Sequence, residues 1–350
     1  VDFVGADYIR TGEDGYEMVN EFVRDMSVEV PDAWSGWSLN QRMRWLHRRV
    51  AERWNYYPDV FDRWNWFRAR KTGALVDKLV TYSRLRKPLW AFTLSWKHGL
   101  EHGQDPLMMT DGGLAVDAAM LYQVPSQGHF DTLVRWWRDY EIQPGDLNLV
   151  VGNQVDWYWH QKTKVPAGPE LYYQRLRSGT KMMGTQLARG IFIHDLARIV
   201  SRLPRRAGEP YPGTEWALAG AAAISRLRSD WRLYPLVLDL EVPKSHPFNS
   251  QFRISAQITN TTDEDLNDVE VSLHDTAGVL IVGPTRRVLE SVPAEGKTSV
   301  PFTVRLTAPS GARANRFMIA AEATWAKDQG PEAGRDLPRK FVTFKYVNGR

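Results

Sequence analysis

The feature that most constrains the fold of this chain is a change of pattern near Pro235. Before this residue, apolar runs typical of buried strands alternate with longer amphipathic segments typical of helices. Strands separated by helical connections predict βαβ units and a parallel sheet. After Pro235 the runs are short, alternate apolar with polar residues and are separated by turn residues, which predicts an all-β sandwich. We therefore expect two domains, residues 1–231 and residues 232–350.

The first domain is expected to be an α/β fold of the (β/α)8 TIM-barrel type. Its expected strands are Val1–Arg10, Leu89–Ser95, Ala115–Leu121, Leu147–Gly152 and Gly190–His194. Neither Gly-x-Gly-x-x-Gly after the first strand nor Gly-x-x-x-x-Gly-Lys occurs, which disfavours a nucleotide-binding sheet. Because five strands do not close a barrel, we expect the first barrel strands to be supplied by an upstream segment or a second chain. A separate five-stranded fold is the alternative.

The second domain is expected to be an immunoglobulin/fibronectin-like sandwich that serves as an accessory module. Eight short alternating runs lie between Leu236 and Val347. The chain contains no cysteine, so the Cys…Trp…Cys framework of antibody domains is missing. The sequence therefore predicts a sandwich of the fibronectin or adhesion type.

Composition narrows the classes of function. The absence of cysteine excludes disulfides and thiol catalysis. The sequence contains no run of eighteen apolar residues, so no membrane-spanning helix is expected. The net charge is +4, from 45 basic and 41 acidic residues, and the arginines are scattered, so no nucleic-acid partner is expected. The spacing of His98, Glu101 and His102 does not fit a helical metal site, and we expect neither metal nor cofactor.

Several short motifs of residues 1–200 occur in an order that resembles a known family. They are Asp7-Tyr8-Ile9-Arg10, the Trp/Arg-rich segment Phe61–Arg70, Lys87-Pro88 before an apolar run, Gln104-Asp105 followed by Gly113–Asp117, and Met120-Leu121-Tyr122. Together they resemble the glycosyl hydrolase-like family 10 proteins, which are barrel proteins related to glycoside hydrolases. The likeness is imperfect, because Ala119 stands where that family has proline. It implies that Asp7 belongs to the fourth strand of a barrel.

Residues at the carboxyl ends of the expected strands are the candidate site, because barrel enzymes place their chemistry there. Glycoside hydrolysis uses two carboxyl groups, and Asp7, Glu13, Asp156 and Asp195 are the candidate catalytic residues. Asp7 is the first candidate for the nucleophile, with Arg10 holding it ionised, although an Asp–Arg pair that only braces the structure is the alternative. The candidate substrate-binding residues, which offer amides and flat aromatic rings, are Arg10, Trp96, His98, Tyr122, Asn153, Gln154, Trp157, Trp159 and His194.

Two functions follow from this pattern. The first is a glycoside hydrolase-like protein that acts on or binds a polysaccharide or oligosaccharide. Fifteen tryptophans and thirteen tyrosines support it if they stack on sugar rings, whereas ordinary core packing is the alternative for each of them. The second is a non-catalytic scaffold or assembly protein that retains a glycosidase-like barrel. An extracellular or cell-envelope location is expected for both.

Overall fold

The computed structural model describes residues 3–11, 15–52, 58–82, 87–94, 96–120, 149–154, 168–184, 189–194, 211–308, 315–331 and 338–350. By its internal contacts the chain divides into two units. The first unit contains Val1–Val124, Gly128–Asn153 and Gly179–Phe192. The second contains Pro125–Gln127, Gln154–Ser178 and Ile193–Arg350. Each unit is described by itself.

The first unit is built around a parallel sheet whose strands lie side by side in chain order, β1-β2-β3-β4-β5. These strands are β1 (Val4–Ala6), β2 (Leu89–Leu94), β3 (Val116–Met120), β4 (Leu149–Gln154) and β5 (Gly190–His194). The register places Ala6 beside Ala91, Ala91 beside Asp117, and Asp117 beside Leu149. The carboxyl ends of the strands consequently lie along one edge of the sheet.

The expectation of a (β/α)8 TIM barrel is wrong. Among the described residues β1 and β5 are the two edges of the sheet, and no pairing joins them. Five parallel strands are too few to close into a barrel, so the sheet stays open. The rest of the described β-structure is antiparallel except for one short parallel pairing, and it belongs to the second unit.

The connecting helices lie on one face of this open sheet. They are α3 (Pro58–Tyr82), α5 (Pro106–Asp111) and α7 (Pro169–Gly184), while the short α4 (Trp96–Glu101) follows the carboxyl end of β2. Val76 of α3 and Met109 of α5 pack with Ala91 of β2, and Gly179 of α7 lies against Val151 of β4. Right-handed crossovers between strands that follow one another in a sheet bring every connection to the same face, which explains this arrangement.

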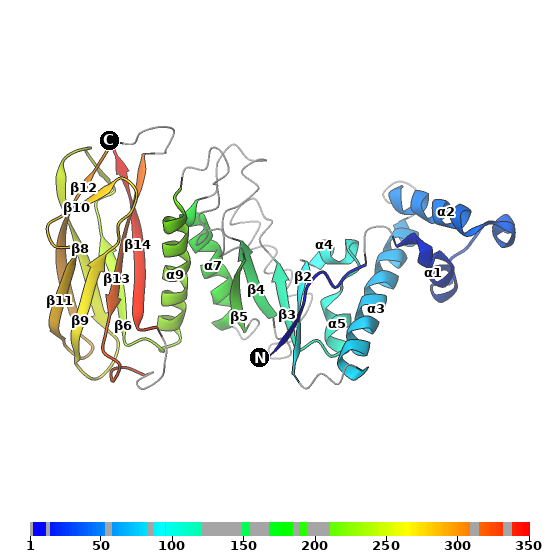
Figure 1. Cartoon of the computed structure of the whole chain (residues 1–350), viewed down its shortest axis with the longest axis horizontal. Helices are drawn as coiled ribbons and strands as arrows, with labels where there is room; N and C mark the ends of the chain where they lie inside the picture. Colours follow the sequence, from blue (N-terminus) through cyan, green and yellow to red (C-terminus); the bar gives the residue numbers. More distant parts are fainter. Residues whose placement is uncertain are drawn as a thin grey trace. The chain divides into compact units, whose positions relative to one another are not determined.

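A small helical cluster packs against the beginning of α3 (Figure 1). It is formed by the 3₁₀ helices η1 (Tyr16–Met18) and η2 (Asp32–Gly36) with α1 (Val19–Asp25) and α2 (Leu39–Ala51). Helix α2 begins at a capping box, in which the Ser38 hydroxyl accepts from the Gln41 backbone N–H and the Gln41 side chain accepts from the Ser38 backbone. Trp64 of α3 is fully buried between Phe22 and Phe67, and these three rings form the centre of the cluster.

The second unit contains two antiparallel sheets that share one core. The sheet orders are β10-β12-β8-β6 and β11-β9-β13-β14-β7, the two-residue β7 being the one parallel addition. The strands are β6 (Leu236–Glu241), β7 (Ser245–His246), β8 (Gln251–Asn260), β9 (Leu266–Leu273), β10 (Val279–Val282), β11 (Arg286–Val292), β12 (Lys297–Leu306), β13 (Arg316–Thr324) and β14 (Lys340–Gly349). Every second residue of β8, from Phe252 to Ile258, is buried in this core.

Helix α9 (Gly213–Asp230) packs on β14 of the same unit (Figure 1). Ala219, Ala222 and Ala223 are buried, and such small side chains allow a close approach of the helix to its neighbours. The Ser225 hydroxyl accepts from the backbone N–H of Val342 at 2.9 Å. Helix α9 therefore groups with the sandwich, and the expected domain boundary at residue 231 stays a prediction. Among the described helices, none combines the length and apolar character needed to cross a lipid bilayer.

Candidate functional site

Asp7, the first candidate for catalysis, follows directly after β1 and is exposed. Its carboxylate accepts from the backbone N–H of Tyr8 at 2.8 Å. Tyr8 has a φ of 52°, an uncommon conformation for a residue other than glycine, and its ring is 74% exposed. The Arg10 guanidinium lies 4.7 Å from the centre of that ring. Arg10 thus stacks on Tyr8, and no ion pair between Arg10 and Asp7 occurs in this described segment.

The structure describes only some of the other predicted site residues. Six of them lie outside the described residues: Glu13, Tyr122, Asp156, Trp157, Trp159 and Asp195. Four have a described backbone but no described side chain, namely Trp96 and His98 in α4 and Asn153 and Gln154 at the end of β4. His194 is the last residue of β5 and is half-buried. Of the candidate catalytic carboxylates, Asp7 alone belongs to the described residues, so the expected pair of carboxyl groups stays a prediction.

Gln104 is a buried residue that the sequence reasoning did not single out as part of the sheet edge. Its side chain is 1% exposed, and its Oε1 accepts from the backbone N–H of Leu94 at 2.8 Å. Its Nε2 donates to the carbonyls of Ile9 at 3.1 Å and Phe92 at 3.2 Å. One amide therefore joins the segment after β1 to the carboxyl end of β2 and holds this edge in place.

Asp117 of β3 is a second buried polar residue of the sheet, nearer the amino end of its strand, and it accepts from the Thr93 hydroxyl at 2.5 Å. By the strand register Asp117 lies beside Ala91, whose side chain packs with the helices. The Asp117 carboxylate consequently points to the helix-covered face of the sheet and not to the opposite face.

The opposite face carries three aromatic rings, Trp90, Phe92 and Phe192, which we call the aromatic face. The ring centres of Trp90 and Phe92 are 4.7 Å apart, and those of Phe92 and Phe192 are 5.2 Å apart. All three rings are partly exposed. They form a continuous surface across the sheet.

Glycines on the neighbouring strands make room for these rings. A Cβ atom at Gly5 of β1 would lie 2.4 Å from the Trp90 indole. A Cβ at Gly152 of β4 would lie 2.1 Å from the Phe192 ring. Trp90 and Phe192 can therefore lie across the adjacent strands, because each of these two rings covers a position without a side chain. The signal in the sequence is a glycine in a strand, which often marks a close approach of another group.

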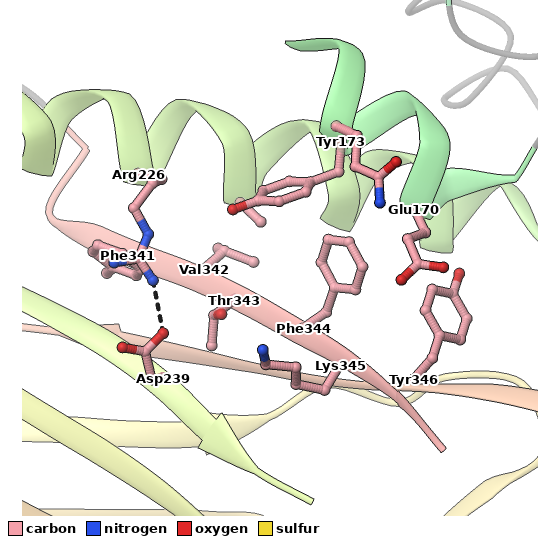
Figure 2. A pocket seen from close by; sticks show the side chains of 12 residues that line it. Glu170, Tyr173, Arg226, Asp239, Phe341, Val342, Thr343, Phe344, Lys345 and Tyr346 are labelled. Carbon is pink, nitrogen blue, oxygen red and sulfur yellow. Dashed lines mark hydrogen bonds and ion pairs between the residues drawn. The ribbon is translucent and has the colours of Figure 1, made fainter. Parts of the chain in front are cut away.

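A pocket of about 170 Å³ lies within the second unit, between α7, α9 and strands β6 and β14 (Figure 2). Its walls include three aromatic rings. Tyr173 of α7 meets Phe344 of β14 edge to face at 5.2 Å, and Phe344 meets Tyr346 in the same way at 5.9 Å. Thr343, Lys345 and Gln174 add polar groups to the lining. The sequence reasoning missed this pocket, since its walls come from segments far apart in the chain.

Ion pairs stand at two positions of this pocket. Arg226 of α9 pairs with Asp239 of β6 at 2.7 Å, as Figure 2 shows. Glu170 of α7 pairs with Arg316 of β13, also at 2.7 Å. Lys345 also lines the pocket, and its ammonium has no ion-pair partner among the described residues. One positive charge of the pocket is thus left without a counter-charge.

Tyr346 joins the pocket to the buried interior of the second unit. Its hydroxyl donates to Oε2 of Glu215, a fully buried residue in the first turn of α9, at 3.4 Å. Burial, with a further contribution from the Glu215 carboxylate, raises the pKa of Tyr346 far above its usual range. Tyr346 therefore remains a neutral hydrogen-bond donor at physiological pH.

Comparison with protein-family models and with curated proteins found no match. The chain is similar to parts of three solved structures, each over 33% of its length. They are Salmonella alpha-2-macroglobulin reacted with methylamine (16% identity, TM-score 0.27), native Escherichia coli alpha-2-macroglobulin from domain MG7 to the C-terminus (17%, 0.26), and E. coli alpha-2-macroglobulin in its native conformation (19%, 0.25).

The similarity covers only 7%, 17% and 7% of those three chains, respectively. At these TM-scores it carries no argument about fold or function. The resemblance to glycosyl hydrolase-like family 10 stays a prediction.

Proposed function

We propose that this protein binds a polysaccharide, and that the aromatic face of the open parallel sheet is its contact surface. The observation that carries the proposal is the row formed by Trp90, Phe92 and Phe192, in which rings cross neighbouring strands over Gly5 and Gly152. Flat aromatic rings stack on the apolar faces of sugar rings, and successive rings suit successive sugar units. The extracellular or envelope location belongs to the same proposal.

The exposed carboxylate of Asp7, at the carboxyl edge of the same sheet, adds a polar group suited to sugar hydroxyls. Hydrolysis of a glycosidic bond requires a second carboxyl group near the first. The remaining candidates for it, Glu13, Asp156 and Asp195, lie outside the described residues. We therefore propose binding, and a separate measurement tests hydrolysis.

The test is the affinity of the full chain for a panel of soluble polysaccharides, measured by affinity electrophoresis. We expect the Trp90→Ala variant to bind its best polysaccharide about tenfold or more weakly, because it loses the largest ring of the face. Trp66→Ala is the matched control, since Trp66 is 43% exposed on α3 and does not belong to the aromatic face. Equal affinities for the native protein and the Trp90→Ala variant would overturn the assignment of the surface.

Two further outcomes separate the functions that the sequence predicts. Release of reducing ends by the native protein that disappears in Asp7→Asn would add glycoside hydrolysis, with Asp7 at its centre. Binding of no member of the panel would favour the non-catalytic scaffold instead.

A further inference from the structure

The pocket between α7 and β14 has the properties of a separate ligand site. Its volume of about 170 Å³ is below the roughly 300–1,000 Å³ of pockets that hold drug-sized ligands. It therefore suits one small ring better than a segment of a polymer. The whole lining belongs to the second unit, so this site is distinct from the aromatic face of the first unit.

The aromatic lining selects a ligand with an apolar face and polar edges. Tyr173, Phe344 and Tyr346 follow one another at 5.2 Å and 5.9 Å between ring centres. Thr343 and the exposed Gln174 supply a hydroxyl and an amide that can each donate and accept hydrogen bonds. Rings for the apolar C–H face and polar groups for hydroxyls are together what a single sugar residue requires.

The charged side chains of the pocket indicate the charge of the ligand. In the Arg226–Asp239 and Glu170–Arg316 ion pairs, each positive charge is balanced by a negative one. The Lys345 ammonium remains, without an ion-pair partner among the described residues. A ligand carboxylate can form an ion pair with this group, whereas a neutral sugar offers it only hydroxyl oxygens as acceptors.

We propose that this pocket binds one carboxylate-bearing sugar, a hexuronic acid, with its carboxylate at Lys345 and the apolar face of its ring on Phe344. The inference rests on the proposed function in that it names the class of glycan, an acidic polysaccharide. The pocket then holds one terminal or side-chain uronate of such a polysaccharide.

The test titrates the full chain with glucuronic acid and galacturonic acid, and in parallel with glucose and galactose, by isothermal calorimetry. We expect both acids to bind, and both neutral sugars to bind at least tenfold more weakly, because they lack the charged contact. Lys345→Gln is expected to remove this difference. The control Lys297→Gln, which changes an exposed lysine at the start of β12, is expected to retain it.

A Phe344→Leu variant tests the ring contact independently of charge and should weaken the binding of both acids. Equal binding of acidic and neutral sugars, or unchanged binding by Lys345→Gln, would overturn the inference. Titration with an oligouronide distinguishes a residue of a polymer from a free sugar acid as the natural ligand.

The Trp90→Ala variant separates this inference from the proposed function. Polysaccharide binding that depends on Trp90, with no uronic acid bound by the native protein, would leave the function standing and overturn the pocket. Uronic acid binding that depends on Lys345, with no polysaccharide bound, would leave the pocket assignment standing and overturn the proposed function.

Discussion

The hydroxyl of Tyr346 on β14 donates to the carboxylate of the fully buried Glu215 on α9, at 3.4 Å. This bond joins a strand of the sandwich to the helix that packs on it, across 131 residues of sequence. Arg316 lies 4.8 Å from the centre of the Tyr346 ring and pairs with Glu170 of α7. Tyr346 therefore stands where β14, α7 and α9 meet.

Replacing Tyr346 by phenylalanine tests this relationship. The variant keeps the ring and removes one hydrogen-bond donor to a buried carboxylate, so the free energy of unfolding is expected to fall by about 1–3 kcal/mol. Denaturant titration followed by circular dichroism measures the change. Tyr82→Phe is the control, because Tyr82 is 77% exposed at the end of α3. An equal stability of Tyr346→Phe and the native protein would show that the bond contributes nothing.

Alanine at the glycines under the aromatic face should displace the rings above them. In Gly5→Ala a Cβ atom would come within 2.4 Å of the Trp90 indole, so the ring must move. We expect a stability loss of about 1–3 kcal/mol and a shift of the Trp90 indole resonance in NMR spectra. Gly36→Ala is the control, because nothing lies within 4 Å of a Cβ atom there. An unshifted indole resonance in Gly5→Ala would contradict the described packing.

Gln104→Leu should destabilise the first unit. The change removes the acceptor for the Leu94 N–H and the donor to the Ile9 and Phe92 carbonyls. Each buried backbone group left without a partner costs about 1–3 kcal/mol, so hydrogen exchange should accelerate first at the ends of β1 and β2. The control Gln251→Leu changes an exposed glutamine at the start of β8. Unchanged exchange rates at Leu94 would argue against this role of Gln104.

The sandwich is expected to lose stability as the pH falls. Burial lowers the pKa of His274 below its usual 6.5, although Glu322, 3.3 Å from Nε2, and Asp275 favour the charged form, and Lys340 opposes it. Below about pH 6.5 the unfolded chain takes up a proton that the folded chain resists, so the free energy of unfolding decreases there. Denaturant titrations at several pH values between 7.5 and 5 measure this decrease.

His274→Gln should reduce that pH dependence, because it removes the group that titrates differently in the two states. The control His47→Gln changes a histidine in the helical cluster of the first unit. If His274→Gln retained the full decrease between pH 7.5 and 5, another group would be its source.

Local patterns predict many individual strands of this protein well. The run Gly190–His194 forms β5 with the expected bounds, and the alternating run Gln251–Asn260 forms β8. The two-residue β7 has too short a pattern to be recognised from sequence. The alternation of apolar and polar residues along a strand can be read from neighbouring residues alone. It reflects the burial of one face of the strand, which occurs in nearly any fold.

The sequence by itself thus determined where many of the strands form and that a parallel region precedes a mainly antiparallel one. The tertiary structure alone decided that the five strands remain an open sheet, that Arg10 stacks on Tyr8 and not against Asp7, and that Tyr173 meets Phe344. Closure of a sheet and contacts between distant segments depend on the packing of the whole unit, which no local periodicity encodes. The pocket is formed by α7, α9, β6 and β14, and only the fold brings these four segments together.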